Sequence, residues 1–179
     1  IESVQRPDGF RYSASFPELG ADWYERSLVW QATNLSKMDI TLDLMSAEGQ
    51  ALLWQLLDGA DVLIENFSPR VVESFGLSED AVRERHPALV YLRMPGFGLV
   101  GPWRDHVGWA MVYEQACGLA QVTGFPDGPP LNPGGFADPV VGMHAAVALQ
   151  AALRHRDRTG EGQLVEVAQH VVEVLRLAA

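Results

Sequence analysis

The chain has 179 residues, of which 47% are hydrophobic and 20% charged. This length suits one domain with a core of its own and is short for two. The 23 acidic residues outnumber the 13 basic ones and give a formal net charge of -10. Nucleic acid and anionic membrane surfaces are therefore poor partners, because both require a broad basic face.

The single cysteine, Cys117, cannot form an internal disulfide, which favours a reducing compartment. No apolar run is long enough to cross a membrane, and no signal-peptide pattern opens the chain. We therefore expect a cytoplasmic protein. The chain begins without Met and stops inside an apolar segment, so we also expect a fragment of a longer protein.

The first 60 residues give few periodic signals. Residues 1–33 show no sustained hydrophobic period and are predicted to form a long ordered loop. Residues 39–44 alternate between polar and apolar side chains, which predicts a half-buried strand. Ser46 is the predicted N-cap of a helix that reaches residue 57, with Gly49 three positions later, so only part of a capping box is present.

From residue 61 onward, strands alternate with helices. We predict strands at residues 62–64, 89–94 and 163–167, and helical segments at 70–75, 79–85 (capped by Ser78) and 109–120. A long helix is predicted from Pro139, with basic residues near its end and Gly160 after it. This alternation predicts an α/β fold with an open, mostly parallel sheet and flanking helices.

Asp138 is the main candidate catalytic residue. Asp before Pro is typical of a helix start, so the local spacing by itself favours a structural N-cap. The alternative is a nucleophile that attacks an acyl group and forms a mixed anhydride. A helix N-terminus would keep such a carboxylate ionised, and the glycines before it would let a bulky thioester approach.

Two polar segments are candidate ligand sites, each with a plain structural alternative. Residues 34–37 (Asn-Leu-Ser-Lys) are either a polar turn with a solvated lysine or a loop whose Lys37 meets a phosphate. Asn66 and Phe67 follow a predicted strand, where ligands of open α/β sheets bind. They either contact a ligand or form a strand-ending turn with a buried Phe.

Several site classes find no support in the sequence. No G-x-G-x-x-G stands between a strand and a helix, so we expect no nicotinamide cofactor, and no flavin is indicated. The five histidines lack metal-ligand spacing, one cysteine does not make a zinc site, and no metal is expected. No G-x-S-x-G elbow is present, which argues against a serine hydrolase.

The order of these motifs resembles the class III CoA-transferase family, which includes formyl-CoA transferase, the carnitine and bile-acid CoA-transferases and α-methylacyl-CoA racemase. The resemblance covers residues 30–170 or thereabouts. It rests on an ordered set of segments: 34–37, 41–44, 61–67 (Asp-Val-Leu-Ile-Glu-Asn-Phe), 89–91, 96–102 (Gly-Phe-Gly-x-x-Gly-Pro), 123–130, 137–138 and 158–163.

The resemblance implies a function and a set of site residues. The family moves coenzyme A between an acyl-CoA and a carboxylic acid through aspartyl anhydride and aspartyl-CoA thioester intermediates, and Asp138 matches the nucleophile. The residues that match the coenzyme A contacts are Asn34, Leu35, Ser36, Lys37, Asn66 and Phe67. Asp39 departs from a more basic family pattern, so phosphate binding would depend on Lys37 together with Arg70.

The resemblance also implies a domain organisation. Residues 1–179 would be a Rossmann-like large domain, incomplete at both ends, without the family's small domain and glycine loop. The full protein would form a homodimer of interlocked chains. Two alternatives remain: a racemase or epimerase, disfavoured because Trp109-Ala110 replaces a His-Asp pair, and an inactive fragment that only folds and associates.

Overall fold

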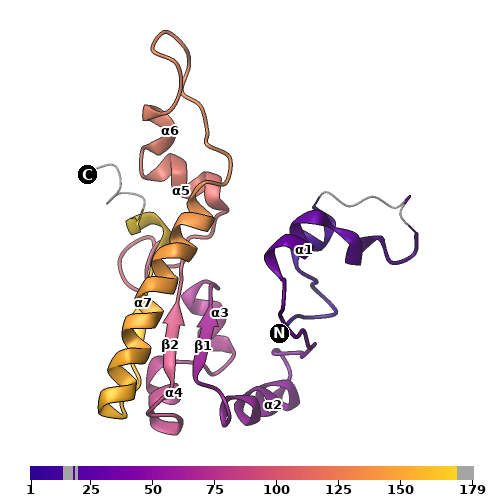
Figure 1. Cartoon of the computed structure of the whole chain (residues 1–179), viewed down its shortest axis with the longest axis vertical. Helices are drawn as coiled ribbons and strands as arrows, with labels where there is room; N and C mark the ends of the chain where they lie inside the picture. The colour runs from indigo at the N-terminus through magenta and orange to yellow at the C-terminus, as the bar shows by residue number, and fades with distance from the viewer. Residues whose placement is uncertain (14–17, 19, 173–179) are drawn as a thin grey trace. The chain divides into compact units, whose positions relative to one another are not determined.

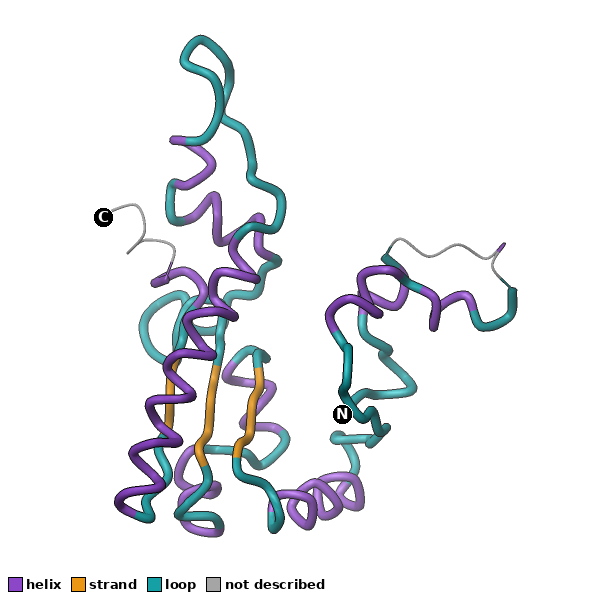
Figure 2. The backbone as a smooth tube through the Cα atoms, in the orientation of Figure 1, coloured by secondary structure: helices purple, strands orange, loops and turns teal. Residues whose placement is uncertain are grey.

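The computed structural model describes residues 1–13, 18 and 20–172. The chain divides into two compact units, Ile1–Leu56 and Leu57–Ala179. Figure 1 labels most of their elements, and Figure 2 colours the backbone by secondary structure.

The N-terminal unit begins with short helices rather than the predicted loop over residues 1–33. Two 3-10 helices, η1 (Gly9–Tyr12) and η3 (Trp23–Arg26), precede α1 (Leu28–Thr33). Asp8 caps η1 by accepting the N–H of Phe10 at 2.7 Å, and Ser27 caps α1. The prediction was wrong because helices of one or two turns are too short to show a hydrophobic period.

The predicted strand at residues 39–44 is also wrong. Pairing there is limited to a single parallel bridge between Glu2 and Thr41. The helix that follows, α2 (Ala47–Leu57), begins as predicted, with Ser46 Oγ accepting the N–H of Gly49 at 2.9 Å. Gly49 is required there, since a Cβ would lie 2.0 Å from the carbonyl oxygen of Asp43.

The second unit contains a three-stranded parallel sheet in the order β1-β2-β3. The strands are β1 (Val62–Glu65), β2 (Val90–Arg93) and β3 (Leu164–Glu166). Helices α3 (Pro69–Ser74) and α4 (Glu79–Arg85) connect β1 to β2, and α5 (Ala110–Ala116), α6 (Leu119–Val122) and α7 (Ala137–Thr159) connect β2 to β3. The α/β fold with a parallel sheet is confirmed.

Helix α7 packs along the central strand and forms the core with it. Leu92 of β2 contacts a cluster of buried side chains from α7 and from the chain after β3: Val140, Val141, Ala145, Val167 and Val172. Arg156, near the end of α7, bonds Asp61 at the start of the sheet at 2.9 Å. The helix thus runs antiparallel to β2, and its first turn lies beyond the carboxyl end of that strand (Figure 1).

Two helix boundaries differ from the prediction. The single helix expected over residues 109–120 is two helices, because Gly118 adopts the left-handed φ of +90° and ends α5. Helix α7 begins at Ala137, with Phe136 as N-cap, rather than at Pro139. Asp138 therefore lies within the first helical turn.

Candidate active site at the start of α7

Asp138 lies in the first turn of α7 and is exposed. Its Oδ1 accepts a hydrogen bond of 2.9 Å from the side-chain amide of Gln169, which follows β3. The expected N-cap role is wrong, because this carboxylate bonds a distant side chain rather than the amides of its own helix. The hydrogen bond thus engages Oδ1 and not the second carboxylate oxygen, Oδ2.

Glu114 on α5 binds backbone amides at and just before the start of α7. This carboxylate is completely buried. It accepts the N–H of Gly134 at 3.1 Å, of Gly135 at 3.0 Å and of Ala137 at 3.1 Å. The start of α7 is thus held by a side chain from another helix.

Glycine is needed in the segment that Glu114 holds. Gly134 and Gly135 have φ angles of +76° and +110°, in the left-handed region that other residues rarely adopt. These conformations turn successive amides toward one carboxylate. We did not identify Glu114 from the sequence, although a signal exists: it is the one charged residue, histidine aside, between Asp105 and Asp127, and a lone carboxylate in an apolar helix requires a buried partner.

The pKa of Asp138 is raised above its ordinary value, contrary to the expected effect of a helix N-terminus. The largest cause is the surrounding protein, which excludes part of the water that would solvate the charge. The Gln169 hydrogen bond lowers the pKa, while the nearby charge of Glu114 raises it further. Glu114 thus both binds the helix amides and adds a like charge.

The Asn66–Phe67 turn follows β1, as the sequence predicts for a ligand site. Asn66 is exposed, and Phe67 is 47% exposed while its ring packs edge to face on Phe75 at 5.6 Å. The alternative of a buried Phe is therefore wrong. Arg70, in the first turn of α3, is also exposed. All three side chains are accessible from solvent at the carboxyl end of the strand.

A buried ion pair supports this turn. Glu65, the last residue of β1, bonds Arg93 of β2 at 2.6 Å, with side chains 4% and 7% exposed. The other carboxylate oxygen of Glu65 accepts the N–H of Phe67 at 2.8 Å. Burial raises the pKa of Glu65, against the opposing effect of Arg93. The pair, which we did not identify from the sequence, fixes the direction in which the chain leaves the sheet.

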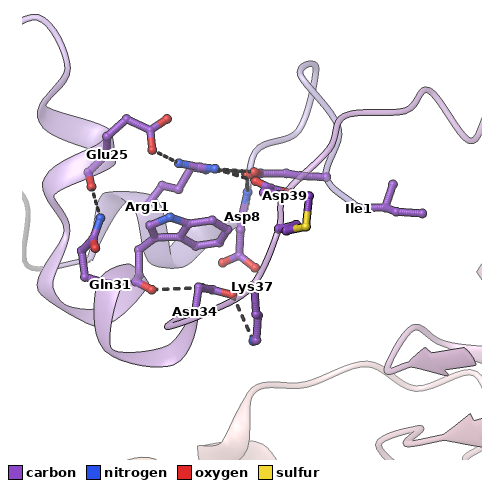
Figure 3. A pocket seen from close by; sticks show the side chains of 11 residues that line it. Ile1, Asp8, Arg11, Glu25, Gln31, Asn34, Lys37 and Asp39 are labelled. Atoms are coloured by element: carbon purple, nitrogen blue, oxygen red, sulfur yellow. Dashed lines mark hydrogen bonds and ion pairs between the residues drawn. The ribbon is translucent and has the colours of Figure 1, made fainter. Parts of the chain in front are cut away.

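In the N-terminal unit, residues 34–37 close the end of α1 (Figure 3). Lys37 Nζ donates to the carbonyl of Thr33 at 2.8 Å and to Asn34 Oδ1 at 3.1 Å. Ser36 has a φ of +60°, the left-handed conformation of a tight turn, and Leu35 is exposed. The lysine is thus held at the helix end, and a ligand phosphate would compete for its ammonium group.

This turn borders a hollow of about 570 Å³ that is rich in carboxylates. Arg11 crosses it and pairs with Glu2 at 2.7 Å, Glu25 at 2.7 Å and Asp39 at 3.0 Å, as Figure 3 shows in part. The guanidinium also lies 3.9 Å from the centre of the Trp30 ring. The carboxylate of Asp39, noted above as a departure from the family pattern, is therefore paired with Arg11, which it shares with Glu2 and Glu25.

Within residues 1–13, 18 and 20–172, no three His, Cys, Asp or Glu side chains gather in a way that would hold a metal ion. No helix in the same residues has both the length and the apolar character needed to cross a membrane.

Comparison with known proteins identifies the family. A family model described as CoA-transferase family III matches residues 1–178. The chain belongs to this family. It is 37% identical over 144 residues to the succinyl-CoA–L-malate CoA-transferase beta subunit of Chloroflexus aurantiacus, covering 79% of this chain and 36% of the relative. It is 38% identical to the succinate–glutarate CoA-transferase of Agrobacterium fabrum, covering 94% of this chain and 43% of the relative.

A solved structure supports the same assignment. The crystal structure of a CAIB/BAIF family protein from Brucella suis matches with a TM-score of 0.80 and 34% identity, covering 85% of this chain and 40% of that one. The family III chain described here thus spans less than half the length of these relatives.

Proposed function

We propose that the full-length protein transfers coenzyme A between an acyl-CoA and a carboxylic acid, with Asp138 as the nucleophile. The observation that carries the proposal is the exposed carboxylate at the start of α7, bonded through one oxygen only. A carboxylate with a raised pKa is also a stronger nucleophile than an ordinary one. The family membership supports the same chemistry.

The proposed reaction needs no external base. Asp138 attacks the acyl carbon, the C–S bond breaks, and coenzyme A leaves as a thiolate, so that a mixed anhydride forms. The thiolate then attacks Cγ of Asp138 and releases the donor acid, which leaves an aspartyl-CoA thioester. The acceptor carboxylate displaces the thiolate from Cγ, and the thiolate finally attacks the acceptor's carbonyl carbon and frees Asp138.

Coenzyme A is proposed to contact the exposed turn after β1. Phe67 offers an accessible ring for the adenine, with Asn66 beside it. Arg70 and Lys37 are the proposed phosphate partners. The names of the relatives make succinyl-CoA with L-malate, and the succinate–glutarate pair, the first substrates to assay.

Trapping of the intermediate tests the proposal. Full-length protein is incubated with acyl-CoA and then with hydroxylamine, and the peptide that contains Asp138 is analysed by mass spectrometry. We expect an aspartyl hydroxamate in the wild type and none in Asp138→Asn, while Asp157→Asn, an exposed site on the same helix, serves as the matched control.

Absence of the hydroxamate in a wild type that turns over acyl-CoA would contradict the proposal. Deuterium entering the acyl α-position from solvent, without transfer to an acceptor, would indicate a racemase instead.

We further propose that the full-length protein acts as a homodimer. The second unit exposes several large apolar side chains that water solvates poorly, among them Trp109 at 68%, Met143 at 61% and Val147 at 73%. Light scattering coupled to gel filtration measures the mass of the full-length protein, and a monomer at micromolar concentration would contradict this point.

A further inference from the structure

Backbone hydrogen bonds hold Gln169 in the position from which its side chain reaches Asp138. Its N–H donates to the carbonyl of Pro95 at 3.1 Å, and the N–H of His170 donates to the carbonyl of Gly96 at 3.0 Å. These bonds tie the chain after β3 to the chain after β2. The side-chain amide of Gln169 therefore projects from a segment anchored at two points.

The anchor itself is closely packed. A Cβ on Gly96 would lie 2.2 Å from the hydroxyl oxygen of Tyr113, so only glycine fits there. The Tyr113 hydroxyl donates to the carbonyl of Gly108 at 2.9 Å, and Glu114 follows Tyr113 in the same helix. Two neighbouring residues of α5 thus act near Asp138: Tyr113 packs beside Gly96, and Glu114 binds the segment before Asp138.

Three backbone donors at and just before the start of α7 are already occupied. In many acyl-transfer sites, free amides at such a position stabilise a negative oxygen. Here Glu114 accepts from Gly134, Gly135 and Ala137. Within the described part of the chain, the donor that reaches the Asp138 carboxylate is the Gln169 amide.

We propose that Gln169 stabilises the negative charge that develops on Asp138 Oδ1 when a nucleophile attacks Cγ of the aspartyl intermediate. This inference rests on the proposed function. In the resting enzyme the hydrogen bond occupies Oδ1 and leaves Oδ2 to attack the donor thioester. In the aspartyl-CoA thioester Oδ1 is the carbonyl oxygen, still beside the amide donor.

The step balances without a proton transfer. An oxygen of the acceptor carboxylate bonds to Cγ, and the pair of electrons of the C=O bond moves onto Oδ1. The tetrahedral species then re-forms the carbonyl and expels the coenzyme A thiolate with the electrons of the C–S bond. Gln169 stays neutral and donates throughout, most strongly when Oδ1 carries the full charge.

Two substitutions in the full-length protein test this role. Gln169→Leu removes the donor, and Gln169→Glu keeps the volume while replacing the amide by a carboxylate. Gln150→Leu, at an exposed position on α7, is the matched control. For both Gln169 variants we expect kcat to fall about 10- to 100-fold, with KM for acyl-CoA no higher than in the wild type and the aspartyl-CoA thioester accumulating.

The pH dependence of kcat/KM is a second measurement. It would stay unchanged if Gln169 had a purely structural role. The Gln169 hydrogen bond favours the ionised form of Asp138, so its loss in Gln169→Leu raises the pKa of the carboxyl further. The acid limb of the kcat/KM profile is then expected at higher pH than in the wild type, and Gln150→Leu leaves it in place.

The outcomes separate this inference from the proposed function. A wild type that forms no adduct at Asp138 refutes both. A wild-type adduct combined with a kcat above half the normal value in either variant overturns the role of Gln169 alone. A loss of kcat without accumulation of the thioester also overturns it. Should the Leu variant not fold, the isosteric Glu variant decides the question by the same criteria.

Discussion

The pKa of a carboxyl group is lowered in the Arg11 cluster of the N-terminal unit and raised at the Asp138 site of the second unit. Around Arg11, three carboxylates share one guanidinium, and hydrogen bonds to Arg11 lower the pKa of Glu2 to about 2. At Asp138, one neutral amide faces one carboxylate, a second carboxylate lies nearby, and the pKa is raised.

The difference separates a stabilising arrangement from the one that we propose for a nucleophile. A carboxylate whose charge is fully balanced is a poor nucleophile, because attack would cost the pairing energy. Asp138 has lost part of its solvent and has gained only one donor, so its charge is less stabilised than in water. We therefore expect substitutions near Arg11 to affect stability, and substitutions near Asp138 to affect turnover.

Glu114 lies near Asp138, but we expect its substitution to affect stability rather than turnover alone. Its removal has the largest expected effect on stability. Glu114→Leu leaves the amides of Gly134, Gly135 and Ala137 without their acceptor. We expect a loss of about 3 to 5 kcal/mol in the free energy of unfolding, measured by urea denaturation of the full-length protein. Glu114→Gln, which keeps one acceptor oxygen, should lose less, and exposed Glu161→Leu should lose under about 0.5 kcal/mol.

A Glu114→Leu protein as stable as the wild type would show that the three amides do not depend on this carboxylate.

Removal of the guanidinium tests the Arg11 side of the comparison. Arg11→Met leaves the Glu2 carboxylate, which is 10% exposed, without its main partner, and is expected to cost about 2 to 3 kcal/mol. The control is Arg26→Met, because the Arg26–Asp22 pair is exposed on both sides and such pairs contribute about 0 to 1 kcal/mol. Hydrogen exchange of peptides from residues 1–39 reports the local stability.

Equal protection of those peptides in the two variants would mean that the Arg11 cluster adds no more stability than a surface pair.

The two carboxylates should also give opposite pH dependences. The folded-state pKa of Glu2, about 2, lies below its ordinary 4.5. Its contribution is therefore present above pH 4.5 and is lost as the pH falls from 4.5 toward 2, by about 1 to 3 kcal/mol. The pKa of Asp138 is raised from 3.8, so its ionisation slightly lowers stability as the pH rises through the window above 3.8.

Unfolding free energies measured across this pH range, for the wild type, Glu2→Gln and Asp138→Asn, separate the two contributions. Glu2→Gln should reduce the loss of unfolding free energy at acidic pH. Asp138→Asn should remove the slight decrease in unfolding free energy that occurs as the pH rises above 3.8. Parallel curves for all three proteins would show that neither group is linked to folding.

The smallest expected effect concerns Lys37. Its ammonium group already bonds Thr33 and Asn34, so a phosphate gains only part of its charge. We expect Lys37→Met to raise KM for acyl-CoA about two- to fivefold with unchanged kcat, and the effect should shrink at high salt. Arg26→Met again serves as the control, and a KM equal to that of the wild type would remove Lys37 from the proposed site.

Much of the second unit could be predicted from the sequence, for local reasons. Ser78 caps α4 by accepting the N–H of Ala81 at 3.2 Å, as the pattern before residues 79–85 indicates. The three strands were recognised from short apolar runs between turn residues, because a buried parallel strand has few polar positions. The helices before residue 34 were missed, since one or two turns give no period to detect.

The candidate site could be predicted only in part. Asp138 and the turn at Asn66 were identified as residues, and their roles remain proposals. The partners that set their chemistry were not found: Glu114 lies 24 positions from Asp138, and Gln169 lies 31 positions away. No local pattern connects residues at such separations, because they meet only after the strands have paired and α7 has packed on β2.

The sequence by itself determined the family, the α/β class and the carboxylate at residue 138, because each depends on local patterns or on the order of motifs along the chain. The tertiary structure decided the hydrogen-bond partner and the pKa of that carboxylate. Packing brings Glu114 to the helix amides and Gln169 to Oδ1, and these contacts, rather than the helix end, set the charge state and the free oxygen of Asp138.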